Sequence, residues 1–253
     1  MKIVRFMEPS EGRATYGVLE GHMVWEITGS IFGNFQKSGR SYASNEVKMV
    51  APLIPNEIIG IGKNYVPNDQ TPPTAPELPI LFFKPKTCVV GPGEDIIIPI
   101  GLSEIMFEAE LAVVIGKSGR NLKESEVKEH IYGYTVANDV STLSYFHPDG
   151  HWTVGKAFDT FCPLGPLIET DLNLLEIRVQ SRTNGILRQD SSISQMVTSI
   201  EQMICFASRF MTLSPGDVLL TGTPDGMGSV RAGDSIECII EGIGTLHNKV
   251  RHA

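Results

Sequence analysis

Residues 104–117, EIMFEAELAVVIGK, restrict the fold of this chain more than any other stretch. Side chains alternate between the two faces of a strand, so one face carries only apolar residues from Ile105 to Ile115. The other face begins with acidic residues, including Glu108 and Glu110, and then becomes apolar. A half-buried strand keeps one polar face to its end. The pattern therefore predicts a strand that becomes buried on both faces, with two carboxylates where that burial begins.

Glu108 and Glu110 lie two positions apart on one face of this predicted strand, close enough to repel each other. Two carboxylates at the edge of a core are destabilising unless something compensates for their charge. A divalent cation is the simplest compensation, and Asp139 in YTVANDVS offers a third oxygen donor at the end of another apolar strand. An all-carboxylate site suits Mg²⁺, Mn²⁺ or Ca²⁺. On spacing alone the alternative is a solvated strand end without an ion, because Glu-x-Glu is a common pattern.

The composition indicates one large domain, or one domain with a small module, and restricts its partners. The chain has 253 residues, of which 42% are hydrophobic and 20% charged, enough to bury a sizeable core. No basic cluster offsets its net charge of −8, which argues against a nucleic-acid or membrane partner. The sequence contains neither a long apolar run typical of a membrane span nor a secretion signal's apolar core. We therefore expect a cytoplasmic protein.

The four cysteines support the same expectation. They are widely spaced and form no CxxC pair, which favours reduced, buried thiols over disulfides or metal ligands. They are Cys88, Cys162, Cys205 and Cys238.

A boundary near residue 52 divides the chain into two predicted domains. Residues 1–52 are interpreted as a small β module, with a hairpin over residues 16–27 that turns at Gly21. The sequence APLIPNE is expected to link this module to a second domain, residues 53–253, in which most stretches are strand-like. The predicted fold class is therefore β-rich α+β.

Two helices and one long loop are expected within the second domain. The apolar spacing predicts a helix over residues 193–211 that Ser191 or Ser192 caps, and the charge pattern predicts another over residues 122–133. Residues 63–79, KNYVPNDQTPPTAPELP, contain five prolines and cannot form a helix or a central strand. Such a loop inside a compact domain is either a functional lid or a disordered insert.

Three further stretches have the residue types of a site, but each is weak alone. Lys156 lies among glycine and apolar residues in WTVGKAFDTF, although a single lysine is usually exposed. LTGTPDGMG contains Thr221 and Thr223 but lacks the GK[ST] pattern of a phosphate loop, so nucleotide binding is not predicted. His147 and His151 in YFHPDGHW are interpreted as exposed loop residues rather than as a ligand pair.

Taken in order, several stretches resemble the fumarylacetoacetate hydrolase family, and the resemblance covers roughly residues 50–251. The N-terminal module is similar to one found in many bacterial and archaeal members. The stretches that carry the resemblance are GKNY, LFFKP, EAELAVVIG, YGYTVANDVS, GKAFDTFCPLGP, LSPGDVLLTGTPDGMG and GDSIECIIEGIGTLHNKV.

This resemblance implies a mixed β-sandwich roll, commonly a homodimer, that holds Mg²⁺ or Mn²⁺ through three carboxylates. Those family positions correspond here to Glu108, Glu110 and Asp139, the residues that the strand pattern had already singled out. The family's motif lysine corresponds to Lys156, which the resemblance implies is catalytic, near the substrate or its developing charge.

The resemblance also implies a set of substrate-binding residues. The threonine of the TGTP motif corresponds to Thr223, with Thr221 as the alternative, near the substrate carboxylate. Lys63 stands before NY, where some members have a substrate-contacting basic residue, and Tyr65 of the same motif is expected to bind substrate. In the family, the metal binds a 2-oxo or 2,4-dioxo acid and stabilises the enolate through which hydrolysis, decarboxylation and isomerisation all pass.

Two segments depart from the pattern of the hydrolytic relatives. Those relatives carry a histidine and a glutamate after NY, where this sequence has Asn68 and Thr71, and neither can act as a general base near neutral pH. The segment after ANDVS usually has the form ARDxQ, but Leu143, Ser144 and Phe146 replace its arginine, aspartate and glutamine. We therefore expect isomerisation or decarboxylation rather than hydrolysis.

The predicted function is a metal-dependent enzyme that acts on a small 2-oxo or 2,4-dioxo carboxylate. It resembles the 2-hydroxyhepta-2,4-diene-1,7-dioate isomerase and decarboxylase branch, or the oxaloacetate tautomerases. One alternative is an acylpyruvate or fumarylpyruvate-type hydrolase with a repositioned base. A second is a metal-dependent binding protein that kept the carboxylates and lost catalysis.

Overall fold

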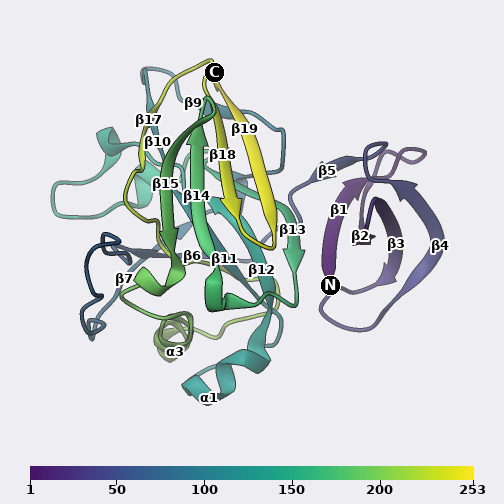
Figure 1. Cartoon of the computed structure of the whole chain (residues 1–253), viewed down its shortest axis with the longest axis horizontal. Coiled ribbons are helices and arrows are strands. Elements are labelled where there is room, and N and C mark those ends of the chain that lie inside the picture. Colours follow the sequence, from purple (N-terminus) through teal and green to yellow (C-terminus); the bar gives the residue numbers. More distant parts are fainter.

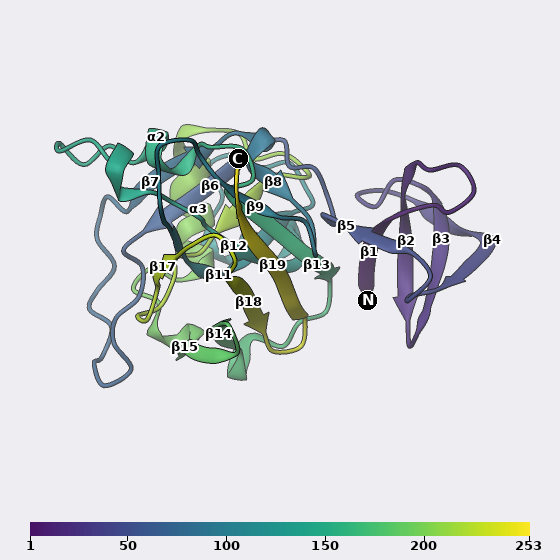
Figure 2. The same cartoon turned by 90° about the horizontal axis from the view of Figure 1, so that it is seen from above.

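The computed structural model describes residues 1–253, apart from the side chain of Glu176. A small group of N-terminal strands lies beside a larger body, and residues near β5 connect the two (Figures 1 and 2). The predicted hairpin is present, because β2 and β3 pair antiparallel and Gly21 takes the positive φ of 60° that the turn requires. The N-terminal strands are β1 (Lys2–Met7), β2 (Ala14–Glu20), β3 (Met23–Gly29), β4 (Phe35–Ala43) and β5 (Lys48–Val50).

One long sheet runs through both parts of the molecule. Its order is β4-β3-β2-β1-β13-β12-β11-β16-β6-β7, so β1 joins the N-terminal strands to the body by pairing with β13. In addition, β5 pairs with β1 and β8 pairs with β13. The strands that the body contributes are β6 (Ile58–Gly62), β7 (Ile80–Lys84), β8 (Val89–Val90), β11 (Ala109–Ile115), β12 (Ile131–Asn138), β13 (Cys162–Glu169) and β16 (Val218–Leu220).

A second sheet covers one face of the body's part of the long sheet. Its order is β15-β14-β18-β19-β9, and β14, β18 and β19 pack against β11, β12 and β13 (Figure 1). A third, two-stranded sheet pairs β10 with β17. The packed sheets form the β-rich α+β fold that the sequence predicts. These strands are β9 (Ile96–Ile98), β10 (Ile105–Phe107), β14 (Arg178–Thr183), β15 (Ile186–Ser192), β17 (Gly228–Val230), β18 (Ser235–Ile240) and β19 (Gly244–His252).

The opening stretch is buried as predicted but is not one continuous strand. All seven residues of β11 are buried, which confirms burial on both faces. However, the stretch is divided at Glu108 into β10, which pairs with β17, and β11, which pairs with β12 and β16. The backbone N–H of Glu108 donates to the side-chain Oδ1 of Asn138, at 2.9 Å, instead of to a strand partner. The interruption redirects the chain at the position of the first carboxylate.

The helices are shorter than predicted. The helix expected over residues 193–211 begins only at Ile200, because Ser199, not Ser191 or Ser192, forms a capping box with Gln202. Before it, residues 197 and 198 are not helical, and their backbone N–H groups donate to the Asn64 backbone and side chain. The α-helices are α1 (Glu124–Val127), α2 (Thr153–Lys156) and α3 (Ile200–Phe210), and the 3₁₀ turns are Lys86–Cys88, Lys128–His130, Leu143–Tyr145, Leu174–Glu176 and Ile193–Gln195.

The cysteines and the helices agree with two further expectations. All four cysteines are buried and free of disulfides, as the absence of paired spacing predicted. None of the described helices combines the length and the apolar character needed to cross a membrane.

Candidate active site

Three carboxylates meet at the place where β11 begins and β12 ends. Glu108 lies in the break before β11, Glu110 is the second residue of β11, and Asp139 follows the last residue of β12. One oxygen from each lies within 4.8 Å of the others. Antiparallel pairing produces this convergence, because the register sets Glu110 opposite Ala137, and the Asp139 N–H donates to the Glu108 carbonyl at 2.9 Å. The structure thus brings together the three residues that the sequence singled out.

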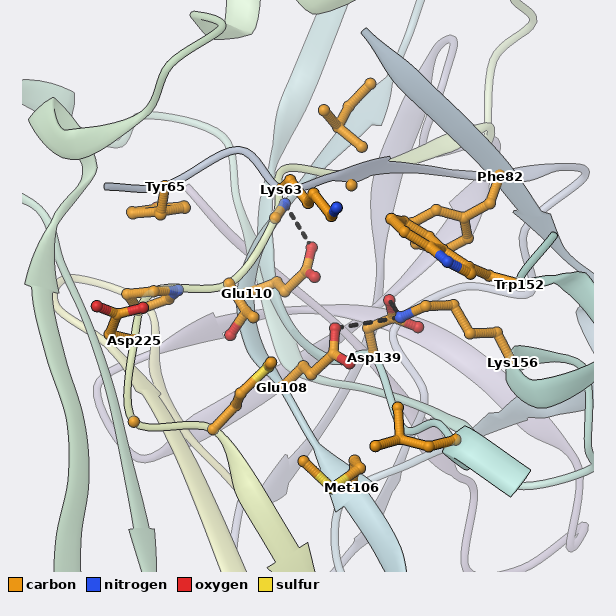
Figure 3. Close-up of a pocket in the computed structure, with 18 of the residues that line it drawn as sticks. Lys63, Tyr65, Phe82, Met106, Glu108, Glu110, Asp139, Trp152, Lys156 and Asp225 are labelled. Carbon is orange, nitrogen blue, oxygen red and sulfur yellow. Dashed lines mark hydrogen bonds and ion pairs between the residues drawn. The ribbon is translucent and has the colours of Figure 1, made fainter. Parts of the chain in front are cut away.

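Two buried lysines lie against these carboxylates on the Asp139 side. Lys156, at the end of α2, donates to Glu108 Oε2 at 3.1 Å and also contacts Asp139 Oδ2 (Figure 3). Lys84, at the end of β7, donates to Asp139 Oδ1 at 2.6 Å and to the Val140 carbonyl at 2.9 Å. Lys156 is therefore not an exposed lysine, and the carboxylate cluster holds it in place.

The charge of the cluster is distributed unevenly, and the pKa values reflect this. Burial raises the pKa of Glu110 well above its usual value, and the charges of Asp139 and Glu108 raise it further. Burial also raises the pKa of Glu108, which Lys156 only partly opposes. For Asp139 the burial effect is outweighed by Lys156 and Lys84, which hold its pKa below the ordinary value.

This donor set fits a divalent cation. Glu110 has no lysine within salt-bridge distance among the described residues, and its Oε2 accepts one hydrogen bond, from the Gly222 N–H at 2.7 Å. Negative charge is therefore least compensated beside Glu110, where a cation would offset it. Three carboxylate oxygens and no sulfur or imidazole donor form a set that Mg²⁺ and Mn²⁺ prefer.

The raised pKa of Glu110 predicts a pH dependence of stability in the metal-free protein. Above the ordinary value of 4.5, the unfolded chain releases this proton while the folded protein retains it. Stability should therefore fall as pH rises, until the pH exceeds the folded-state pKa. Thermal scans between about pH 5 and pH 8 with a chelator should show a steeper decline for the wild type than for Glu110→Gln. Equal slopes for the two proteins would contradict this assignment.

The carboxylates line a cavity of about 560 Å³. Figure 3 shows Glu108, Glu110 and Asp139 pointing into it, with Lys63 and Tyr65 toward the Glu110 side and Phe82 and Trp152 toward the Lys156 side. Besides these residues, the lining consists of Ile61, Gly62, Met106, Leu143, Phe146, Gly222, Thr223, Pro224, Asp225, Gly226 and Met227.

The KNY segment brings Lys63 and Tyr65 to the cavity. Lys63 has a φ of 55°, in the left-handed region that residues other than glycine rarely adopt. Asn64 secures this turn by donating to the carbonyls of Thr198 and Thr221, at 3.0 and 2.9 Å. The Tyr65 hydroxyl has no hydrogen-bond partner among the described residues, and burial raises its pKa, so it stays protonated.

The two threonines of the TGTP motif have different surroundings. Thr221 is completely buried and donates to the Leu111 carbonyl at 2.8 Å, so it does not line the cavity and its hydroxyl supports β11. Thr223 does line the cavity. Its hydroxyl donates to the Ala109 carbonyl at 2.8 Å and accepts from Gln189 at 2.7 Å. Of the two expected substrate contacts, only Thr223 is accessible in this geometry.

Sequence reasoning did not identify several residues that build the site. Lys84 has no signal of its own within the stretch LFFKP, yet its position two residues after the inward-facing Phe82 puts it on the buried face of β7. Gln189 is completely buried and fastens the TGTP segment to β11. Asp225 and Trp152 line the cavity but had no distinguishing pattern in the sequence.

The remaining candidate residues lie outside the cavity. His147 is an exposed loop residue, as expected, and neither it nor His151 lines the cavity. Asn68, in the place of the hydrolases' histidine, bonds to β15 instead, because it donates to the Asp190 carbonyl at 2.9 Å and accepts from Ser191 at 2.6 Å. Thr71 is exposed.

Residues 66–79 form no helix or strand within the described chain, in agreement with the predicted proline-rich loop. We expect this segment to be mobile without ligand and ordered when Mg²⁺ and oxalate, a mimic of the enolate, are bound. Closure would exclude water and strengthen electrostatic interactions in the cavity. Limited proteolysis should therefore cleave the segment more slowly in the presence of Mg²⁺ and oxalate than with Mg²⁺ alone. Equal cleavage rates would argue against a lid.

Comparison with known proteins identifies the family. Residues 57–251 match the family described as fumarylacetoacetate (FAA) hydrolase C-terminal, and residues 1–52 match the Rv2993c-like N-terminal family. The mitochondrial oxaloacetate tautomerase fahd2 of Xenopus laevis is 43% identical over 221 residues, which cover 81% of this chain and 69% of that protein.

Solved structures agree over the whole chain. The 5-carboxymethyl-2-hydroxymuconate delta-isomerase from Mycobacterium smegmatis has a TM-score of 0.93 and 38% identity, with 100% of both chains covered. The 2-hydroxyhepta-2,4-diene-1,7-dioate isomerase from Mycobacterium marinum has a TM-score of 0.91 and 36% identity, covering 100% of this chain and 98% of that one.

A more distant structure contains a metal. It is the maleylpyruvate hydrolase from Sphingobium sp. SYK-6 in complex with manganese(II) and pyruvate, with a TM-score of 0.83, 27% identity and 100% of both chains covered. Family match, relatives and fold agree with the resemblance drawn from the sequence motifs. The chain therefore belongs to the fumarylacetoacetate hydrolase family and is an enzyme of that family.

Proposed function

We propose that this enzyme isomerises or decarboxylates a small 2-oxo or 2,4-dioxo carboxylate through an enolate, and that it requires a divalent metal. The observation that carries the proposal is the group of three carboxylates, Glu108, Glu110 and Asp139, which line the cavity with one oxygen of each within 4.8 Å of the others. The names of the similar proteins, isomerases and oxaloacetate tautomerases, support the same reaction class.

The proposed cofactor is Mg²⁺ or Mn²⁺, held by the same three carboxylates. A bound cation would supply positive charge to offset the charge that develops on the 2-oxo oxygen. The oxygen-only donor set and the raised pKa of Glu110 support this assignment. A relative with bound manganese(II) and pyruvate supports it independently.

The chain's own residues would bind and orient the acid. Lys156 is held by Glu108 and Asp139, and it stays cationic because the charges of these carboxylates raise its pKa more than desolvation lowers it. It is proposed to stabilise developing negative charge as the catalytic lysine. Tyr65, which stays protonated, and Lys63 are proposed to donate to the substrate carboxylate, and Thr223 lines the same cavity.

The surroundings of the cavity favour isomerisation or decarboxylation over hydrolysis. A hydrolase needs a general base near the attacking water. No histidine is present among the described lining residues, and Asp225 is the one carboxylate there besides the cluster. Asn68 is hydrogen-bonded to β15. Proton movement on a stabilised enolate, or loss of CO₂ to form one, requires no activated water.

The proposal predicts the ranking of reactions. Tautomerisation or decarboxylation should exceed acylpyruvate hydrolysis by at least about tenfold in kcat/KM, or about 1.4 kcal/mol of transition-state stabilisation. NMR in D₂O with Mg²⁺ separates exchange at C3, CO₂ release and C–C cleavage in one panel of 2-oxo and 2,4-dioxo acids. Efficient acylpyruvate cleavage with oxaloacetate unchanged would reverse the ranking.

Hydrolysis of an acylpyruvate or fumarylpyruvate type of substrate is the second candidate. Two observations favour it: the similar fold of a maleylpyruvate hydrolase, and Asp225, an exposed carboxylate at the cavity that forms no salt bridge among the described residues.

We further propose that the protein is a cytoplasmic homodimer. Light scattering on the purified protein would determine the number of subunits, and fractionation of the source cells its compartment.

A further inference from the structure

The ammonium of Lys156 has an aromatic ring as a partner besides its two carboxylates. Lys156 Nζ donates to Glu108 and Asp139, and it also lies over the ring of Phe82, 4.6 Å from the ring centroid. A cation at this distance is attracted by the quadrupole of the ring. Phe82 is 5% exposed and Lys156 3%, so little water screens this attraction. Figure 3 shows Phe82 and Trp152 together on the Lys156 side of the cavity.

Two glycines on β6 leave room for the rings. Phe82 on β7 pairs with Gly60 on β6, and a methyl group at Gly60 would overlap the Phe82 ring. On the same face, two residues later, a methyl group at Gly62 would overlap the indole of Trp152. The Phe82 and Trp152 rings meet edge to face, with centroids 6.1 Å apart and an interplanar angle of 61°. Packing against β6 and Trp152 thus holds the Phe82 ring in place.

The ring attracts the lysine without using its last hydrogen-bond donor. An ammonium carries three N–H donors. Glu108 and Asp139 accept two of them, and no other oxygen among the described residues accepts a hydrogen bond from Lys156 Nζ. The face of a ring attracts the charge but contributes no oxygen that would hold the remaining N–H. Because Lys156 lines the cavity, this donor is available to a bound acid.

We propose that Phe82 is a positioning residue whose ring holds the Lys156 ammonium beside the carboxylates through a cation–π interaction, and this inference rests on the proposed function. The stem of a lysine is flexible, so the position of its charge depends on what attracts it. A divalent cation bound to Glu108 and Asp139 would offset their negative charge and weaken their attraction for the lysine. The attraction of the ring would remain, and it would keep the ammonium at the cavity.

The test changes the electrostatics of the ring and keeps its shape. Phe82 is replaced by phenylalanine that carries one, two or three ring fluorines, which withdraw electron density from the ring face in steps. Tautomerisation of oxaloacetate is measured with Mg²⁺. With three fluorines we expect kcat to fall at least about fivefold, the loss of a desolvated cation–π contact. KM should change less than about twofold, because Lys156 acts on charge that develops in the transition state.

A second measurement needs neither metal nor substrate. Urea denaturation with a chelator gives the midpoint of each fluorinated protein, both with Lys156 present and with Lys156→Met. Each fluorine should lower the midpoint only when Lys156 is present, because a cation responds to the electron density of the ring and a thioether does not. A ring that merely fills space would shift the midpoint equally in both backgrounds.

Phe6 provides the matched control. It is completely buried in the N-terminal module, where its ring lies 5.5 Å from that of Tyr42, centroid to centroid. The same fluorinated residues at Phe6 should leave kcat unchanged. If Lys156→Met does not fold, the Phe6 proteins serve as the comparison for the effect of fluorine in a packed core.

The outcomes separate this inference from the proposed function. A stepwise fall of kcat with fluorines at Phe82, and none with fluorines at Phe6, supports the positioning role. A kcat that does not depend on fluorine at Phe82, or equal midpoint shifts in the two backgrounds, would overturn that role and leave the enolate chemistry intact. If no 2-oxo acid is turned over with Mg²⁺ but the midpoint shifts still require Lys156, the proposed function is wrong and the contact between the ring and the lysine stands.

Discussion

Glu110→Gln is expected to abolish divalent-metal binding and to lower kcat/KM by about 10³-fold, or about 4 kcal/mol of transition-state stabilisation. Glutamine keeps an oxygen that can accept from the Gly222 N–H, so the loop contact at 2.7 Å survives while the charge is lost. Activity with excess Mg²⁺ and calorimetric titration of the metal would measure both effects. Because the substitution removes the carboxylate whose pKa is most raised, the metal-free variant should be at least as stable as the wild type.

Glu104→Gln provides the matched control for this experiment. Glu104 precedes β10 and pairs with Arg231 at the surface, at 3.0 Å, outside the cavity. Its substitution makes the same chemical change and should affect neither metal affinity nor turnover. Alanine at Glu108 or Asp139 should also abolish activity in a folded protein. Full activity of Glu110→Gln together with unchanged metal affinity would mean that the metal binds elsewhere.

Lys84→Met is expected to reduce the free energy of unfolding of the metal-free protein by about 3–5 kcal/mol. The ion pair between Lys84 and Asp139 is completely buried, with 0% exposure of both side chains, so the substitution leaves a buried carboxylate with less compensation. Lys156 still contacts Asp139, but it also donates to Glu108 and so compensates Asp139 only in part. The Val140 carbonyl loses the hydrogen bond that Lys84 donates. Urea denaturation in the presence of a chelator measures the loss.

Two companion variants test whether the unpaired charge causes this destabilisation. Lys86→Met changes an exposed lysine two residues later and should alter stability by less than about 0.5 kcal/mol. Adding Asp139→Asn to Lys84→Met removes the carboxylate as well and should restore part of the loss, since no buried charge is then left without its partner. If Lys84→Met were as stable as Lys86→Met, the ion pair would contribute little.

Much of the carboxylate cluster could be predicted because its signal is local. The apolar residues at alternate positions from 105 to 115 indicate a buried strand face. On the other face, Glu108 and Glu110 precede the apolar residues, which marks them as carboxylates at the edge of the core. Asp139 likewise stands at the end of an apolar strand. The combination of motifs along the chain then identified the family, which the comparisons confirm.

Local patterns were less reliable where a distant segment competes for the backbone. The apolar spacing before Ile200 is helical, yet Thr198 lies outside the helix, because its backbone N–H donates to the side chain of Asn64, 134 residues away in the chain. The strand through Glu108 is interrupted for a similar reason, because the backbone N–H of Glu108 donates to the Asn138 side chain. Periodicity records which side chains are buried, whereas the hydrogen-bond partner of each backbone group depends on the tertiary fold.

The sequence by itself thus determined the β-rich class, the family, the pair of carboxylates and their third partner. Only the tertiary structure decided what surrounds them. Lys84 reaches Asp139 across 55 residues and the Gly222 N–H reaches Glu110 across 112. The rings of Phe82 and Trp152 likewise meet at the cavity from separate segments. A period of two assigns a side chain to a face of its own strand, but it carries no information about which distant side chains the packed sheets bring to that face.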